Sequence, residues 1–107
     1  DIPRTYAGAV FLTAWQGDEL VGTGALTPAG ERCGQIVRMS VAKTVRRAGI
    51  GRAILNELLE RARQLGLRRV ILETTETWND AVQFYLAAGF RMTHHQDGDV
   101  YFVMEVE

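Results

Sequence analysis

Apolar residues recur along the middle of the chain with the period of a helix. They occupy one face of residues 49–65 at three- and four-residue spacing. These positions are Ile50, Ile54, Leu58, Ala62 and Leu65, with Leu55 and Leu59 widening the stripe. Gly66 follows directly and is expected to end the helix, because glycine favours the left-handed conformation that follows a last helical turn. The pattern predicts an amphipathic helix packed on a core.

Shorter runs of β-branched and apolar residues on both sides of this helix predict strands. They lie at residues 9–15, 20–27, 35–42, 69–75, 90–94 and 100–106. Gly17-Asp18 between the first two runs favours a hairpin turn. Consecutive apolar residues predict burial on both faces for 35–42 and a central place in the sheet for 100–106. A second helix is expected at 81–88, capped by Thr77 or Asn79 and ended by Gly89.

The order of these elements is β-β-β-α-β-α-β-β, which predicts an α/β layer arrangement with a mixed sheet. The passage from strand to helix to strand makes 35–42 and 69–75 parallel neighbours. The chain has 107 residues, of which 47% are hydrophobic and 23% charged, and this suits one small core. No repeat or interdomain linker interrupts it, so we expect a single domain over residues 1–107.

Charge is distributed unevenly along the chain. Residues 38–69 hold nine Lys or Arg and two Glu, whereas the rest holds three Arg and eleven Asp or Glu. A basic middle suits an anionic ligand, although a solvated helix face is the simpler interpretation of the arginines after residue 60. No aromatic residues interleave the basic ones, so nucleic acid is not the expected partner. Without a membrane-length apolar run or a signal-peptide pattern, and with the single Cys33, we expect a cytoplasmic protein with no membrane partner.

A basic, glycine-spaced turn precedes the long helix, at Arg46-Arg47-Ala48-Gly49-Ile50-Gly51. The first backbone N–H groups of a helix lack partners within it, and together with the helix dipole they form an anion site, most naturally for phosphate. Glycine lets a ligand approach the main chain where a Cβ would block it. The GK[ST] ending of a nucleotide-hydrolysing P-loop is missing. The turn therefore predicts phosphate binding without nucleotide hydrolysis.

The residues around this turn resemble the GNAT superfamily of acyl-CoA-dependent N-acyltransferases. Arg46-x-x-Gly49-x-Gly51 is similar to its Q/R-x-x-G-x-G/A signature, and residues 79–90, NDAVQFYLAAGF, are similar to its second motif, N-x-x-A-x-x-F-Y-x-x-x-G-F. Residues 38–41 look like its fourth strand, and 22–26 like part of its hairpin. The resemblance spans roughly residues 9–106. It implies a mixed, mostly antiparallel sheet with a central parallel strand pair, splayed to form a CoA cleft and flanked by helices.

The resemblance also implies a bound acyl-CoA, most often acetyl-CoA. Its pantetheine arm is expected beside the backbone of Met39 and Val41, where the family's strand has a bulge. Asn79 matches an asparagine that helps to hold the cofactor, although it could equally be a helix cap. The pyrophosphate is expected on the turn and the first helical residues, namely Arg46, Arg47, Ala48, Gly49, Ile50, Gly51 and Arg52.

Acyl transfer to an amine needs a proton acceptor, an oxyanion donor and a proton for the departing thiolate. The resemblance places Tyr85 near the thioester sulfur as the general acid, with core packing as the plainer alternative. A strand N–H near Val41 is the expected oxyanion donor. Many relatives carry a carboxylate base near the position of Gln35, which cannot accept a proton. Glu73 or Glu76 could serve instead, directly or through water, with Glu73 the preferred candidate, and bulk water is an equally simple acceptor.

The leading hypothesis is an N-acetyltransferase that moves an acetyl group from acetyl-CoA to a primary amine, of a small molecule or a peptide, in a ternary complex. The alternative is a GNAT-like module that binds acyl-CoA without turnover. Family members usually have a strand and one or two helices before the hairpin, and these lie outside this sequence. Without them the first hairpin strand would be a sheet edge, and this predicts a homodimer.

Adjacent His94 and His95 point to opposite strand faces, so we expect no metal site. Trp15 and Trp78 are interpreted as packing or interface residues.

Overall fold

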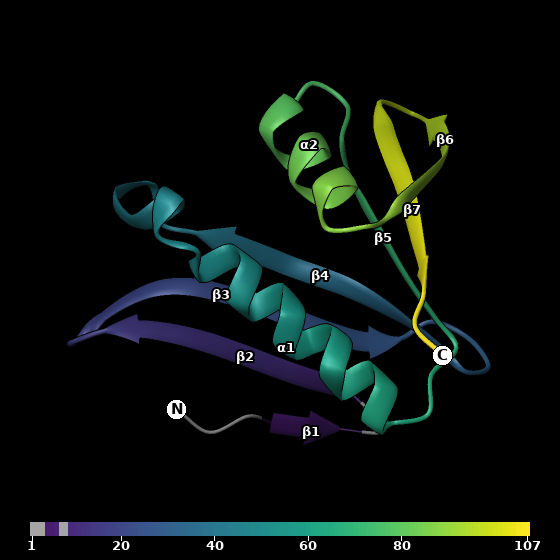
Figure 1. Cartoon of the computed structure of the whole chain (residues 1–107), viewed down its shortest axis with the longest axis horizontal. Helices are drawn as coiled ribbons and strands as arrows, with labels where there is room; N and C mark the ends of the chain where they lie inside the picture. Colours follow the sequence, from purple (N-terminus) through teal and green to yellow (C-terminus); the bar gives the residue numbers. More distant parts are fainter. Residues whose placement is uncertain (1–3, 7–8) are drawn as a thin grey trace.

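The computed structural model describes residues 4–6 and 9–107, apart from the side chains of residues 4–6, Arg46 and Arg47. The described part of the chain forms a sheet covered by two α-helices (Figure 1). The strands are β1 (Arg4–Tyr6), β2 (Ala9–Gln16), β3 (Glu19–Pro28), β4 (Cys33–Val41), β5 (Arg69–Thr75), β6 (Arg91–Gln96) and β7 (Asp99–Glu105). The helices are α1 (Ile50–Gln64) and α2 (Asn79–Ala87), and a 3₁₀ segment, η1 (Lys43–Ala48), leads into α1.

The seven strands form one sheet in the order β1-β2-β3-β4-β5-β7-β6. Every pair is antiparallel except β4 with β5, which is parallel. The expectation of a mixed, mostly antiparallel sheet with one central parallel pair is thereby confirmed. The short strand β1 was not predicted. It pairs with β2, so the first hairpin strand is not the sheet edge that the sequence suggested.

The predicted elements match the observed ones, with ends that differ by one or two residues. Gly17, Gly66 and Gly89 all have positive φ, in agreement with the predicted hairpin turn and the two predicted helix ends. The cap of α2 was predicted wrongly. Trp78 is the residue before the helix, and no side-chain hydrogen bond caps it. Burial along β4 alternates rather than extending to both faces, because no described helix covers the second face of the sheet.

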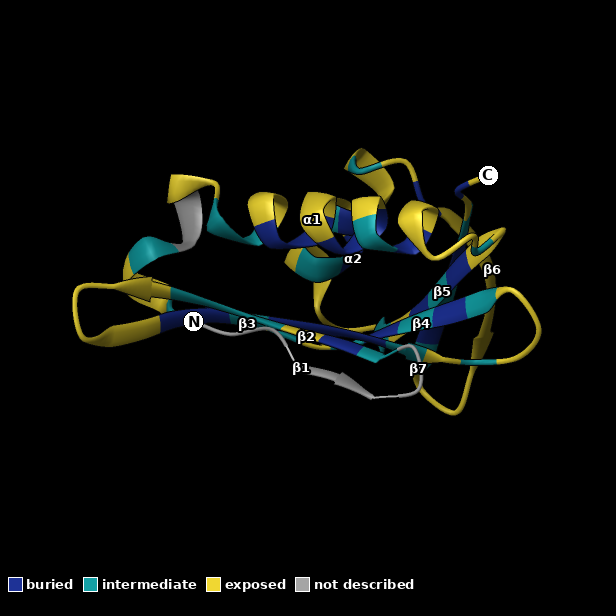
Figure 2. Ribbon diagram, turned by 90° about the horizontal axis from the view of Figure 1, so that it is seen from below, coloured by how far each residue is buried: buried dark blue, intermediate teal, exposed yellow. Residues whose placement is uncertain are grey.

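Both helices lie on the same face of the sheet (Figure 2). The apolar stripe of α1 packs over β2, β3 and β4. Its buried residues are Ile54, Leu55, Leu58, Leu59 and Ala62. Gly22 and Gly24 of β3 allow this close approach, because a Cβ at either position would lie within 2.8 Å of an Ile54 side-chain atom. The predicted amphipathic helix therefore packs closely on β3, because the two glycines leave room for its side chains.

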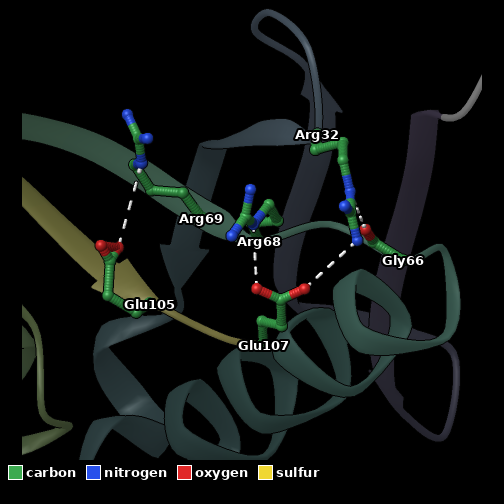
Figure 3. A network of polar contacts seen from close by, with 6 residues as sticks. All are labelled: Arg32, Gly66, Arg68, Arg69, Glu105 and Glu107. Carbon is green, nitrogen blue, oxygen red and sulfur yellow. Dashed lines mark hydrogen bonds and ion pairs between the residues drawn. The ribbon is translucent and has the colours of Figure 1, made fainter.

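A polar network joins the segment after α1 and the residue before β4 to Glu107 (Figure 3). Arg32 donates to the Gly66 carbonyl at 3.2 Å and pairs with Glu107 at 3.3 Å. Arg68 pairs with the same carboxylate at 2.9 Å. These side chains are about half exposed, so each pair contributes roughly 0–1 kcal/mol. The stronger connection is main-chain, since the Arg32 carbonyl accepts the Arg68 N–H at 2.7 Å.

Candidate active site

A bulge interrupts β4 where it pairs with β3. Thr23 pairs with Ser40 and Ala25 pairs with Val37, so Arg38 and Met39 together face the single residue Gly24. Arg38 adopts a φ of 57°, which is unusual for a residue other than glycine. The Thr23 hydroxyl donates to the Arg38 carbonyl at 2.7 Å and holds this conformation. The bulge bends β4 locally and redirects its side chains.

Beyond its first residues, β4 moves away from β5. The two strands pair only at Cys33–Arg69, Gly34–Val70 and Gln35–Ile71. The divergence opens a cleft of about 300 Å³. It is lined by Ile36, Val37, Arg38 and Met39 of β4, by Leu72, Glu73, Thr74 and Thr75 of β5, and by Trp78, Tyr85 and Asp99. Successive strand residues point to opposite faces, so this lining comes from both faces and the cleft passes between the strands.

The start of α1 presents unsatisfied backbone donors beside the end of β4. Gly49 has a φ of 82° and open space where its Cβ would be. No side chain caps the helix, and no residue in the described ranges accepts the N–H groups of Ile50, Gly51 or Arg52. A Cβ on Gly51 would lie 3.2 Å from a Val41 methyl group. The structure therefore brings the glycine turn against the strand that borders the cleft.

Most of the residues predicted to bind the cofactor lie on β4, on η1 and at the start of α1. Met39 and Val41 lie on β4, and Met39 lines the cleft. Ala48 ends η1, Gly49 is the cap between η1 and α1, and residues 50–52 begin α1. The backbones of Arg46 and Arg47 lie in η1, but their side chains are outside the described part. Asn79 is the exposed first residue of α2 and does not line the cleft, whereas its neighbour Trp78 does.

Tyr85 is the buried aromatic residue of the cleft. Its side chain is 8% exposed, and its ring contacts Phe84, Phe90 and Phe102 at centroid distances of 5.2, 5.9 and 5.9 Å. Its hydroxyl makes no hydrogen bond to any residue that the structure describes. Burial raises the pKa of Tyr85 above its ordinary value of 10.0, so the hydroxyl keeps its proton at neutral pH. Tyr85 therefore packs in the core and also lines the cleft with a protonated hydroxyl.

Among the candidate proton acceptors, the cleft includes only Glu73. Its carboxylate belongs to β5 and is exposed. Gln35 lies where β4 and β5 still pair, and it does not line the cleft. Glu76 is not a lining residue either, and its carboxylate contacts the His95 ring at 3.3 Å. Of the two glutamates considered from the sequence, the preferred one, Glu73, therefore lines the cleft and Glu76 does not.

Among the lining residues that were not proposed as site residues from the sequence are Arg38, Trp78 and Asp99. Trp78 is 63% exposed, which does not suit core packing and leaves the interface role that was expected as the alternative. The bulge accounts for Arg38, and the pairing of Thr75 with Asp99 brings Asp99 to the cleft. A bulge has no local sequence signature here, so neither position could be found from spacing.

Within residues 4–6 and 9–107, no group of three or more His, Cys, Asp or Glu could hold a metal ion. His94 stacks on Tyr101 with centroids 4.4 Å apart, and His95 contacts Glu76. Neither helix of the described chain is long and apolar enough to cross a membrane.

Known proteins share both the sequence pattern and the fold. The family model described as the Acetyltransferase (GNAT) family matches residues 3–90. The uncharacterized N-acetyltransferase YsnE of Bacillus subtilis is 35% identical over 83 residues, which cover 76% of this chain and 55% of YsnE. N-acetyltransferase 8B of Rattus norvegicus is 36% identical over 101 residues, which cover 87% of this chain and 46% of that protein. The chain spans about half the length of these curated relatives.

Two solved structures illustrate the likeness of fold. A GNAT-family acetyltransferase of Staphylococcus aureus Mu50 superposes with a TM-score of 0.85 at 21% identity, covering 94% of this chain and 70% of that one. A Bacillus subtilis acetyltransferase in complex with CoA superposes with a TM-score of 0.80 at 22% identity, covering 91% of this chain and 76% of that one. Because the family model covers most of the sequence and the sheet has the same architecture, this chain belongs to the GNAT acetyltransferase family.

Proposed function

We propose that this chain carries the catalytic domain of an N-acetyltransferase, which transfers an acetyl group from acetyl-CoA to a primary amine by direct attack in a ternary complex. The observation that carries the proposal is the cleft between β4 and β5, with a buried tyrosine on one side and a carboxylate on the other. It lies next to a helix start with unsatisfied N–H groups. Membership of the family supports the same reaction.

The residues present suit a CoA ester. The N–H groups of residues 50–52 and the dipole of α1 provide an anion site for the pyrophosphate, with Ala48, Gly49 and the backbones of Arg46 and Arg47 beside it. The backbone of β4 at Met39 and Val41 would border the pantetheine arm. The Bacillus subtilis neighbour was solved in complex with CoA, which agrees with this assignment. Acetyl-CoA would supply the activated acetyl thioester.

Two side chains of the cleft then each carry out one proton transfer. Glu73 accepts a proton from the amine, whose nitrogen forms a bond to the acetyl carbon. A backbone N–H of β4 donates to the carbonyl oxygen, a type of contact that contributes about 3–4 kcal/mol. Tyr85 donates its proton to the sulfur as the carbon–sulfur bond breaks. Asn79 lies at the start of α2, away from the cleft lining, so its proposed contact is with an outer part of the cofactor.

A thiol-release assay tests this function. The purified protein is incubated with acetyl-CoA and a panel of primary amines, from small polyamines and amino sugars to peptide N-termini and lysine side chains. Release of CoA that depends on one class of amine, with acetylated product seen by mass spectrometry, is the expected result. Calorimetric binding of acetyl-CoA without thiol release across the panel would instead identify a non-catalytic acyl-CoA-binding module.

Three wider expectations belong to the same proposal. The acceptor is a small molecule or a peptide, the protein acts in the cytoplasm, and it assembles as a homodimer. The pairing of β1 with β2 removes the exposed hairpin strand that motivated the dimer. Light scattering at micromolar concentration checks the dimer directly, and a strictly monomeric species contradicts it.

A further inference from the structure

Three side chains form a row across the sheet next to the cleft. Glu73 of β5 pairs in register with Tyr101 of β7, and Tyr101 pairs in register with His94 of β6. The neighbouring Leu72 and Phe102 are buried in the core beneath the helices. Since side chains alternate along a strand, Glu73, Tyr101 and His94 lie on the opposite face, which no described helix covers. The row therefore begins at a cleft residue and leads away from it.

A second bulge places His94 in this row. Met92 pairs with Phe102, but the next pair along is His94 with Tyr101, so Thr93 is an extra residue in β6. Without the bulge, Thr93 would stand opposite Tyr101 and His94 would point to the other face. The register shift thus replaces a short hydroxyl side chain with an imidazole. That ring lies flat on Tyr101, with centroids 4.4 Å apart and planes 4° from parallel.

Hydrogen bonds fix the imidazole in place. The Thr93 hydroxyl lies 3.1 Å from the Tyr101 carbonyl oxygen and 3.0 Å from Nδ1 of His94. A carbonyl oxygen can only accept, so the hydroxyl donates to it and Nδ1–H of His94 donates to the hydroxyl. The bulge, the hydroxyl and the stacked ring together hold Tyr101 from one side.

On the strand opposite to β6, Tyr101 lies beside Glu73 of β5. As an in-register cross-strand pair, the two side chains stand beside each other on the same face of the sheet. Burial and then the charges of Glu73, Asp99 and Asp97 raise the pKa of Tyr101. The hydroxyl is therefore protonated at neutral pH and can donate to the carboxylate.

We propose that Tyr101, supported by the stacked His94 and the Thr93 bulge, is a positioning residue that orients the Glu73 carboxylate toward the amine in the cleft. This inference rests on the proposed function, in which Glu73 accepts the proton from the amine. An exposed glutamate on a strand has several accessible rotamers. A donor fixed on the neighbouring strand selects one of them and leaves an oxygen of the carboxylate for the incoming amine.

A double-mutant cycle tests this role. Tyr101→Phe keeps the ring and its stack but removes the hydroxyl, and it should lower kcat about 10-fold, a part of the ~10²–10⁴-fold that a general base contributes. The KM for acetyl-CoA should not change, because Tyr101 lies away from the helix start. In a Glu73→Gln background the same substitution should cause no further loss. Equal losses in both backgrounds, or no loss in either, would overturn the positioning role.

Two further measurements separate support from simple packing. His94→Ala should lower kcat, whereas His94→Phe, which retains a stacked ring, should recover most of it; equal losses would contradict the support by His94. His95→Gln, on the other face of the same strand, is the matched control and should leave kcat unchanged.

The ¹³Cζ signal of Tyr101, titrated in both wild type and Glu73→Gln, should show a lower pKa in the variant. Wild-type protein that releases no thiol with any amine refutes the proposed function itself, whereas wild-type turnover with independent losses refutes only the role of Tyr101.

Discussion

Replacing Tyr85 with phenylalanine should separate catalysis from stability at this site. The substitution removes one oxygen and keeps the ring that contacts Phe84, Phe90 and Phe102. The hydroxyl makes no hydrogen bond to a described residue, so none is lost. No described side-chain N or O atom is both sealed from solvent and unpaired, which means that this oxygen keeps some access to the cleft. We therefore expect the free energy of unfolding to change by less than about 1 kcal/mol.

The effect on turnover should be far larger. The raised pKa of Tyr85 keeps the hydroxyl protonated at neutral pH, where it can donate to the departing sulfur. General acid catalysis contributes ~10²–10⁴-fold. Loss of that contribution corresponds to roughly 3–5 kcal/mol in the activation barrier. Tyr85→Phe should thus reduce kcat by at least about 100-fold while the fold and the affinity for acetyl-CoA stay intact.

Three measurements on the same preparation decide the question: thiol release for kcat, calorimetry for acetyl-CoA affinity, and urea unfolding for stability. Phe90→Leu is the matched control, because Phe90 packs on the same ring and is 3% exposed. It should cost about 1–2 kcal/mol of stability and far less kcat than Tyr85→Phe. Full turnover by Tyr85→Phe with unchanged cofactor affinity would refute the assignment of the acid, whatever the stability data show.

Three other outcomes are expected. Gly49→Ala places a Cβ on a residue with φ of 82°, and Gly66→Ala does the same at the other end of α1, with φ of 77°. Each should cost about 1–2 kcal/mol of stability. Only Gly49→Ala should weaken acetyl-CoA binding measured by calorimetry. Thr23→Val removes the hydroxyl that holds the Arg38 carbonyl; urea unfolding should show a loss of about 1 kcal/mol, and acetyl-CoA affinity should fall because the bulge borders the cleft. Since the folded-state pKa of Tyr85 lies above 10.0, the contribution of Tyr85 to stability is complete below pH 10 and declines as pH rises through the folded-state value. Thermal unfolding from pH 8 to 11 checks this, and a contribution already lost by pH 9 would contradict it.

The elements whose residues repeat with a clear period could be predicted from the sequence. The stripe of α1 identifies the helix, and β5 was predicted at residues 69–75, as it is observed. Gly66 and Gly89 were identified as helix ends because positive φ is a property of glycine itself. In each case the information is local to a few neighbouring residues.

Features that depend on a neighbouring strand could not be predicted in this way. Arg38, with its positive φ, lies in the bulge between the pairs Val37–Ala25 and Ser40–Thr23, and these partners on β3 lie more than ten positions earlier in the chain. Gln35 is likewise kept from the cleft because β4 still pairs with β5 there, and this cannot be seen in the sequence around Gln35. The Thr93 bulge, which determines the residue that faces Tyr101, is decided by the register of β6 on β7. Chemistry at this site is therefore set by strand register more than by motif spacing.

The divergence of β4 from β5 also explains which kind of ligand suits the cleft. On their outer edges both strands are paired, β4 with β3 and β5 with β7. On the inner edges, pairing between them ends at Gln35 and Ile71. Backbone groups at residues 36–39 and 72–75 border the cleft instead of a neighbouring strand, and such groups need partners. An extended ligand that itself carries amide groups can provide them, as an added strand would. The pantetheine arm of CoA contains two amides, so the proposed cofactor suits the chemistry of this part of the cleft.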